Sequence, residues 1–268
     1  MTPQKTRQPP RARQRGISLY VILIIVLLSM LLALWASRTA LFNEMVVGND
    51  ADYQRAFEAA QAMLQDAEFD IRGEKPDGSG TACVPPQGSA TVCRTETGQL
   101  HFPAEAADVD KLLDALDQYP VQCQAEQCPN FKCQNGLCQK FTGEQDFWND
   151  AAVFKEMIKP GVGARYGQFT GATGGGANDS HAASASVSPI LTDRSAGKGA
   201  WYWIEVLPFD SASANQAGQL IVNAGNQTMV PLHVVPAVAY RITAVAMGRK
   251  AGSRVVLQQT YVRQKLKD

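Results

Sequence analysis

The hydrophobic pattern begins with one uninterrupted apolar stretch. No charged residue occurs between Gly16 and Ser37. Its central part, residues 17–36, is 20 residues long. As a helix it would span about 30 Å at about 1.5 Å per residue, which is enough to cross a bilayer. No clean small-x-small site follows it, so we expect the segment to be kept rather than removed as a secretory signal.

The pattern then becomes periodic without a break. Polar residues, Asp52 and Asp66 among them, fill the second face of this part of the chain. We predict one helix over 17–72, with Gly48 as its weakest point and Gly73 as its stop. The apolar residues at helical spacing are Tyr53, Ala56, Phe57, Ala60, Met63, Leu64, Ala67 and Ile71.

The middle of the chain has weaker patterns. Residues 73–160 form a variable region that contains all the cysteines, with short helices expected over 109–117 and 146–159. Residues 161–200 are rich in Gly and Ser and predict a long loop, mobile at 171–187. The side chains that the two short helices offer to a core are Val109, Leu112, Leu113 and Leu116, then Trp148, Ala152, Phe154 and Met157.

The C-terminal part, 201–268, predicts an antiparallel sheet. Runs of branched and aromatic residues occupy 201–209, 233–248 and 253–264, and residues 249–252 make the turn between the last two. Alternation of polar and apolar residues favours one buried and one solvated face. The expected fold class is α+β: a long N-terminal helix packed on an antiparallel sheet, with a disulfide-rich insertion.

The charge distribution predicts how the chain is oriented across a membrane. The chain has 25 basic and 25 acidic residues, and five of the basic ones lie in residues 1–16, which have no acid. The remainder therefore has 20 basic and 25 acidic residues, a net charge of −5. A neutral chain argues against nucleic acid as a partner. Positive charge before an apolar helix favours a cytoplasmic N-terminus and a periplasmic C-terminal domain.

Six cysteines follow the apolar segment, which is typical of an oxidising compartment. They are disulfide candidates, and their connectivity stays open among 15 complete pairings. Zinc and reduced thiols are the alternatives, but the gaps of four residues in CQAEQCPNFKCQNGLC are unlike zinc knuckles. Gln134, Asn135 and Gly136 predict a turn in a stapled hairpin or small loop. The six are Cys83, Cys93, Cys123, Cys128, Cys133 and Cys138.

No pattern indicates an enzyme. His101, His181 and His233 lie far apart in the sequence, and no metalloprotease, hydrolase or calcium-loop motif occurs. We expect no catalytic residue, no metal and no cofactor.

The N-terminal pattern resembles that of type IV pilins and pseudopilins. The shared features are a basic leader, a glycine, an apolar residue after it, and a long two-part helix. The resemblance implies that a prepilin peptidase removes residues 1–16 by cutting between Gly16 and Ile17 and then N-methylates Ile17. The apolar segment 17–36 would remain as a transmembrane helix of the mature protein.

Within this class the chain is most similar to the PilX-type minor pilins of type IV pilus assembly. The similarity lies in RGISLYVILIIVLL, in RTALFNEMVVGNDADYQRAFEAAQAMLQDAE, and in WIEVLP with AYRITAVAMGRKAGSRVVLQQTYVR. It implies an inner-membrane protein that primes pilus assembly with other minor pilins and the major pilin, supports twitching motility, and ends at the pilus tip at the cell surface. A tip adhesin is a further implied partner.

One position departs from the main class. Major pilins have Glu as the fifth mature residue, whereas the fifth residue after Gly16 is Val21. In the family that Glu neutralises the buried ammonium of the preceding subunit, so a subunit without it fits best at the tip. Two alternatives remain open: a tip pseudopilin of type II secretion, and a membrane-anchored periplasmic enzyme or binding protein.

Overall fold

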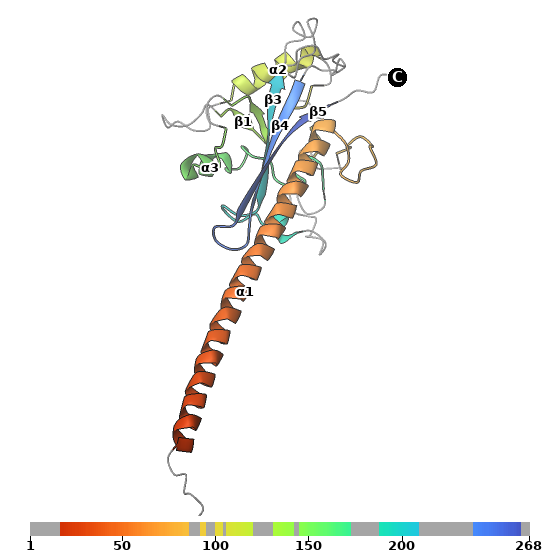
Figure 1. The fold of residues 1–268 in the computed structure, drawn as a ribbon. Coiled ribbons are helices and arrows are strands. Elements are labelled where there is room, and N and C mark those ends of the chain that lie inside the picture. Colours follow the sequence, from red (N-terminus) through yellow and green to blue (C-terminus); the bar gives the residue numbers. More distant parts are fainter. Residues whose placement is uncertain are drawn as a thin grey trace, which may run out of the picture. The chain divides into compact units, whose positions relative to one another are not determined.

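The computed structural model describes residues 17–85, 92–94, 100–103, 106–119, 131–141, 145–172, 188–208 and 238–263. The chain divides after residue 50 into two compact units, and α1 contributes to both. A long helix and a mostly antiparallel sheet confirm the expected α+β fold (Figure 1). The elements are α1 (Ile17–Arg72), α2 (Ala106–Asp117), β1 (Cys133–Gln134), β2 (Leu137–Gln139), α3 (Ala151–Met157), α4 (Pro189–Thr192), β3 (Ala200–Pro208), β4 (Val238–Met247) and β5 (Arg254–Val262).

The sheet has the strand order β1-β2-β3-β4-β5. Strands β3, β4 and β5 pair antiparallel, as the sequence predicts, with Trp203 opposite Thr243. The hairpin of β1 and β2 confirms the turn expected at Asn135 and Gly136, both of which have positive φ. Its addition to the main sheet was not predicted: β2 runs parallel to β3, with Leu137 opposite Ile204.

Both faces of β3 and β4 are buried, so the expected solvated face is wrong for these strands. Glu205 and Thr243 point to that face and are each 1% exposed. The even-numbered residues of β3 and β4, such as Tyr202 and Ile242, belong to one core, and odd-numbered ones such as Trp203 belong to another. A strand buried on two sides has an almost continuous apolar run, which AWYWIEV has.

The first core lies between the sheet and residues 51–72 of α1. Figure 1 shows these last turns of α1 against the sheet. The helix face is built from small residues: Ala56, Ala59, Ala60 and Ala67 are at most 1% exposed, with Met63 among them at 0%. These side chains share one buried core with the even-numbered residues of β3 and β4, so the amphipathic half of α1 covers the sheet as expected.

The second core is aromatic. Phe131 and Phe141 meet edge to face at 4.4 Å, and Phe147 meets Trp203 at 4.9 Å. The Trp203 indole N–H donates to the carbonyl oxygen of Met157 at 3.3 Å. These rings cover the side of the sheet that the alternation pattern assigned to solvent.

Helix α3 is shorter than the predicted 146–159. It begins at Ala151 because the Asp150 carboxylate accepts the N–H groups of Ala152 and Val153 and caps the helix. The face expected to be buried also differs. Phe154 and Met157 are buried, whereas Ala152 is exposed and Trp148 is half-buried.

Helix α2 confirms the prediction at 109–117, and Val109, Leu112 and Leu116 join the first core. Residues 161–200, predicted as a long loop, contain the helix α4 and buried residues on both sides of it. Ala164 forms a β-bridge with Tyr202. Most of the stretch 171–187 lies outside the described residues.

Gly136 allows the β1–β2 turn to lie close to Ala164, which bridges to β3. It has φ +81, and a Cβ there would lie 2.6 Å from the Cβ of Ala164. Gly78 has a similar φ of +73 but no atom within 4 Å of such a Cβ. Gly136→Ala should therefore lower the free energy of unfolding by about 1–3 kcal/mol more than Gly78→Ala does. Urea unfolding of the full chain in detergent, followed by tryptophan fluorescence, measures both, and equal losses would show that the close approach is unimportant.

Candidate assembly interface and the anchor of its helix

The N-terminal part of α1 presents a mostly apolar surface. Every residue from 17 to 47 is exposed. Apolar area in water costs about 25 cal/mol per Å², so a surface of this extent calls for a membrane or a protein partner. Within the described residues, α1 is the one helix long and apolar enough to cross a membrane, which is compatible with a single-pass anchor. Its large exposed side chains include Ile17, Leu19, Tyr20, Ile22, Leu31, Leu34, Trp35, Phe42 and Val47.

The predicted processing site lies at the start of this surface. Gly16 is outside the described residues, and Ile17 is the first residue of α1, with 76% of its surface exposed. Val21 follows one turn later and is 44% exposed. Cleavage after Gly16, methylation of Ile17 and the role of Val21 stay predictions.

Asp52 ties α1 to the turn between β4 and β5. Its carboxylate accepts the backbone N–H groups of Arg249 at 2.9 Å and Lys250 at 3.0 Å. Burial opposes ionisation, but these bonds and one from Ser253 together lower the pKa of Asp52. A Cβ at Gly248 would lie 2.4 Å from the Asp52 carboxylate, so glycine is needed at this contact.

Asp70 forms a buried ion pair near the end of α1. Arg94 Nε donates to its two carboxylate oxygens at 2.8 and 2.9 Å, and the side chains are 4% and 1% exposed. The Tyr202 hydroxyl donates to Asp70 Oδ2 at 2.8 Å. Burial raises the pKa of Asp70, although the Arg94 charge and these hydrogen bonds oppose the rise. The hydrogen bond from Tyr202 joins Asp70 on α1 to β3, the central strand of the sheet.

Asp66 lies one helical turn before Asp70 and is also buried. It accepts the backbone N–H of Gly167 at 2.7 Å and the hydroxyl of Thr170. Burial raises the pKa of Asp66 to about 7; the two hydrogen bonds oppose the rise, while the Asp70 charge adds to it.

The prediction that Asp52 and Asp66 lie on a polar helix face is wrong. Both are 2% exposed. Their spacing held the missing signal, because positions 52, 56, 59, 63, 66 and 70 follow one another at intervals of three or four residues. The carboxylates therefore share the face of the core alanines instead of opposing it.

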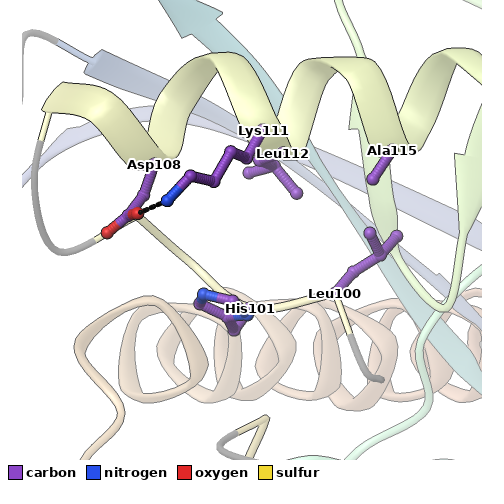
Figure 2. Close-up of a pocket in the computed structure, with 6 residues that line it drawn as sticks. All are labelled: Leu100, His101, Asp108, Lys111, Leu112 and Ala115. Carbon is purple, nitrogen blue, oxygen red and sulfur yellow. Dashed lines mark hydrogen bonds and ion pairs between the residues drawn. The ribbon is translucent and has the colours of Figure 1, made fainter. Parts of the chain in front are cut away.

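A shallow cavity of about 220 Å³ lies between α2 and the segment of Leu100 and His101 (Figure 2). On α2, Lys111 Nζ lies 3.1 Å from Asp108 Oδ1, so the two charges facing the cavity already pair with each other. Leu112 and Ala115 complete the lining. In the described part of the chain, no three His, Cys, Asp or Glu side chains come together as metal ligands.

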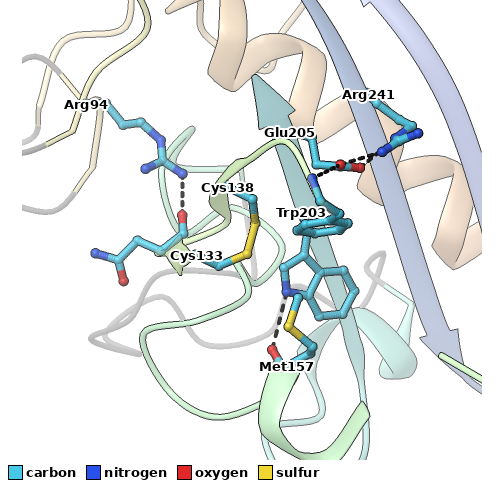
Figure 3. The surroundings of a disulfide bond; sticks show 9 residues. Arg94, Cys133, Cys138, Met157, Trp203, Glu205 and Arg241 are labelled. Atoms are coloured by element: carbon cyan, nitrogen blue, oxygen red, sulfur yellow. Dashed lines mark hydrogen bonds and ion pairs between the residues drawn. A yellow bond between two sulfur atoms is a disulfide. The ribbon is translucent and has the colours of Figure 1, made fainter. Parts of the chain in front are cut away.

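The described residues contain two disulfides, Cys83–Cys93 and Cys133–Cys138. The second closes the β1–β2 hairpin and lies between Arg94 and Trp203 (Figure 3). Both agree with the expected disulfide-rich insertion. Cys123 and Cys128 lie outside the described residues.

A long N-terminal helix, apolar and exposed at first and then packed on a mostly antiparallel sheet, defines a pilin-like protein. Residues 134–263 match the family model described as type IV pilus assembly protein PilX C-term. The matched residues span β2 to β5 and are thus similar to the PilX C-terminal domain, and the match supports a role in type IV pilus assembly.

Members of the PilX family are components of the pilus assembly machinery, and the family is not a known enzyme family. No curated protein and no solved structure shows significant similarity to the chain.

Asp66 should make stability depend on pH near neutrality. The folded protein holds the pKa of Asp66 at about 7, above the ordinary 3.8, so it keeps a proton that the unfolded chain releases. The free energy of unfolding therefore falls as the pH rises toward about 7. Asp66→Asn removes this effect. The free energy of unfolding of the variant, minus that of the unsubstituted protein, should rise by roughly 3 kcal/mol from about pH 5 to about pH 8.

Asp52→Asn is the matched control on the same helix. Because the pKa of Asp52 is lowered below 3.8, its carboxyl is ionised in both states over this pH range. Its stability difference should stay constant while that of Asp66→Asn changes. Urea titrations at several pH values measure both, and a constant difference for Asp66→Asn would contradict the buried carboxyl.

Proposed function

We propose that this protein is a minor pilin that primes type IV pilus assembly in a membrane complex of minor pilins and then sits at the pilus tip. The observation that carries the proposal is the PilX C-terminal domain on a chain whose α1 exposes every residue from 17 to 47. Recognition of other subunits is then the chemistry of the protein. Its partners are other minor pilins, the major pilin, the prepilin peptidase and a tip adhesin.

The apolar part of α1 would serve twice. Before assembly it holds the protein in the inner membrane, with residues 51–268 in the periplasm. After the peptidase has removed 1–16 and methylated Ile17, the same surface packs against the helices of neighbouring subunits. Both environments are apolar, so the helix leaves the lipid without exposing its side chains to water.

Val21 supports a position at the tip. A subunit without a carboxylate there cannot neutralise the terminal ammonium of a subunit ahead of it, and an unpaired charge in an apolar bundle costs several kcal/mol. At the tip no subunit precedes it. The next subunit along can still supply a carboxylate to the ammonium of Ile17.

A tip pseudopilin of type II secretion is the alternative in the same class, because it would share the leader and the missing Glu. The PilX match favours the pilus. A membrane-anchored enzyme or binding protein is the alternative from another class. The cavity beside α2 is its best support, but its two charges already pair.

Processing after Gly16 is the first test. Co-expression of the full chain with a prepilin peptidase should produce a mature protein that begins at Ile17. Intact mass measurement should then show the loss of 16 residues and the gain of one methyl group. The same chain without the peptidase is the control and should keep its leader. An intact leader in the presence of active peptidase would remove the pilin interpretation.

Gly16→Leu should block this cleavage and leave membrane insertion unchanged, because the apolar segment 17–36 is intact. Normal pili containing the processed variant would show that the proposed cut is wrong.

Val21→Glu tests the tip position. A carboxylate at this position should let the subunit follow another one in the fibre. The ratio of this protein to the major pilin in sheared pili should then rise severalfold, since the charge pairing is worth several kcal/mol. Val21→Gln has nearly the same shape without the charge and should leave the ratio low. Equal ratios for both variants would contradict the electrostatic account.

A further inference from the structure

Arg94 connects three parts of the domain that lie far apart in the sequence. Its Nε binds Asp70 on α1, and its Nη2 donates to the backbone carbonyl of Asn135 at 2.6 Å. The guanidinium also lies over the ring of Phe169, 3.6 Å from the ring centroid. In Figure 3 it points toward the hairpin closed by Cys133 and Cys138. The helix, the hairpin and the segment before α4 therefore all meet at this one side chain.

Arg94 is the residue directly after a disulfide cysteine. Cys83 is held close to the end of α1, because its N–H donates to the carbonyl of Gly73 at 2.8 Å. Cys93 is held beside Phe169, where its N–H donates to the Phe169 carbonyl at 2.7 Å. The bond between the two sulfurs thus ties Arg94 to the part of the molecule that contains Asp70.

The position of Arg94 matters because Asp70 is buried in an acidic surrounding. Asp66 lies one turn away on the same helix, where the Asp70 charge helps to raise its pKa, and the Tyr202 hydroxyl is a neutral partner of Asp70. Without the guanidinium, Asp70 would have to ionise unpaired next to Asp66 or bind a proton. Removing one partner of a buried ion pair is strongly destabilising, since it leaves an uncompensated charge.

We propose that the Cys83–Cys93 disulfide is a redox-dependent latch that holds Arg94 on Asp70, so that oxidation of this cysteine pair completes the docking of residues 51–72 of α1 on the sheet. In the reduced protein Arg94 leaves Asp70, and this end of the helix loosens. The proposal concerns the folded domain and does not depend on a role in pilus assembly.

The redox step is a thiol–disulfide exchange with a disulfide as oxidant, supplied by a protein or a small molecule. The thiolate of one cysteine attacks a sulfur of the oxidant and forms a mixed disulfide, which releases one oxidant thiolate. The second cysteine, as a thiolate, displaces the other oxidant sulfur. Two protons and two electrons leave the cysteine pair, and the oxidant becomes a dithiol or two thiols.

A double-mutant cycle tests the latch. The full chain in detergent is prepared unsubstituted, as Cys83→Ser with Cys93→Ser, as Asp70→Asn, and as the triple variant. If the disulfide acts through Arg94 and Asp70, removing it should shift the unfolding equilibrium constant much less in the Asp70→Asn background. We expect the effect of removing the disulfide on the unfolding equilibrium constant to differ between the two backgrounds by a factor on the order of tenfold or more. The same cycle with Asp52→Asn should be additive, because Asp52 contacts the β4–β5 turn instead.

The rival explanation is that the disulfide only restricts the unfolded chain. Then removing the disulfide would cost the same with and without the Asp70→Asn substitution, and additivity within about threefold would overturn the proposal. A coupling of equal size in the Asp52→Asn cycle would overturn it as well, because the effect would not be specific to Asp70.

Hydrogen exchange locates the effect. The cysteine double variant should lose backbone protection in residues 66–72 of α1 by severalfold, and residues 52–60 should change little. If this variant does not fold at all, adding Asp70→Asn should restore a cooperative unfolding transition. A triple variant that also fails to fold, or a uniform loss of protection along α1, would overturn the latch.

Discussion

The packing of the small-residue face of α1 on the sheet is the contact on which the rest of the domain depends. Ala56, Ala59, Ala60 and Met63 share one buried core with the residues of β3 and β4 that face the helix. Because this face is shielded from water, every polar group on it needs a protein partner. The three carboxylates of the face each have one, in the β4–β5 turn, in Gly167 and Thr170, and in Arg94.

One helix carries two kinds of surface in sequence. Residues 17–47 are exposed and mostly apolar, and from residue 52 one face of the helix is buried in the domain. The first part has no fixed partner within the described residues and is available to lipid or to other helices. The second part is held by polar contacts whose geometry is specific. Under the proposed function, this separation would let the first part move from lipid to neighbouring helices while the second part keeps the domain folded.

The sequence predicted what depends on long or local patterns. Helix α1, the three C-terminal strands and the turn at Asn135 and Gly136 follow from periodicity and turn chemistry. Features set by distant partners were missed. Asp66 was placed on the wet face because its partner Thr170 is 104 residues away. The odd-numbered face of β4 looked solvated because nothing local shows that Phe131 and Phe147 cover it.

The parallel pairing of β2 with β3 has a consequence for the order in which the fold is built. The β1–β2 hairpin is local, and the disulfide between its cysteines, five residues apart, can form before β3 is in place. Its neighbour in the sheet, Ile204, comes 67 residues after Leu137, and β4 and β5 come later still. The edge of β2 therefore stays unpaired until β3 forms. Pairing with β3 then makes the hairpin part of the five-stranded sheet.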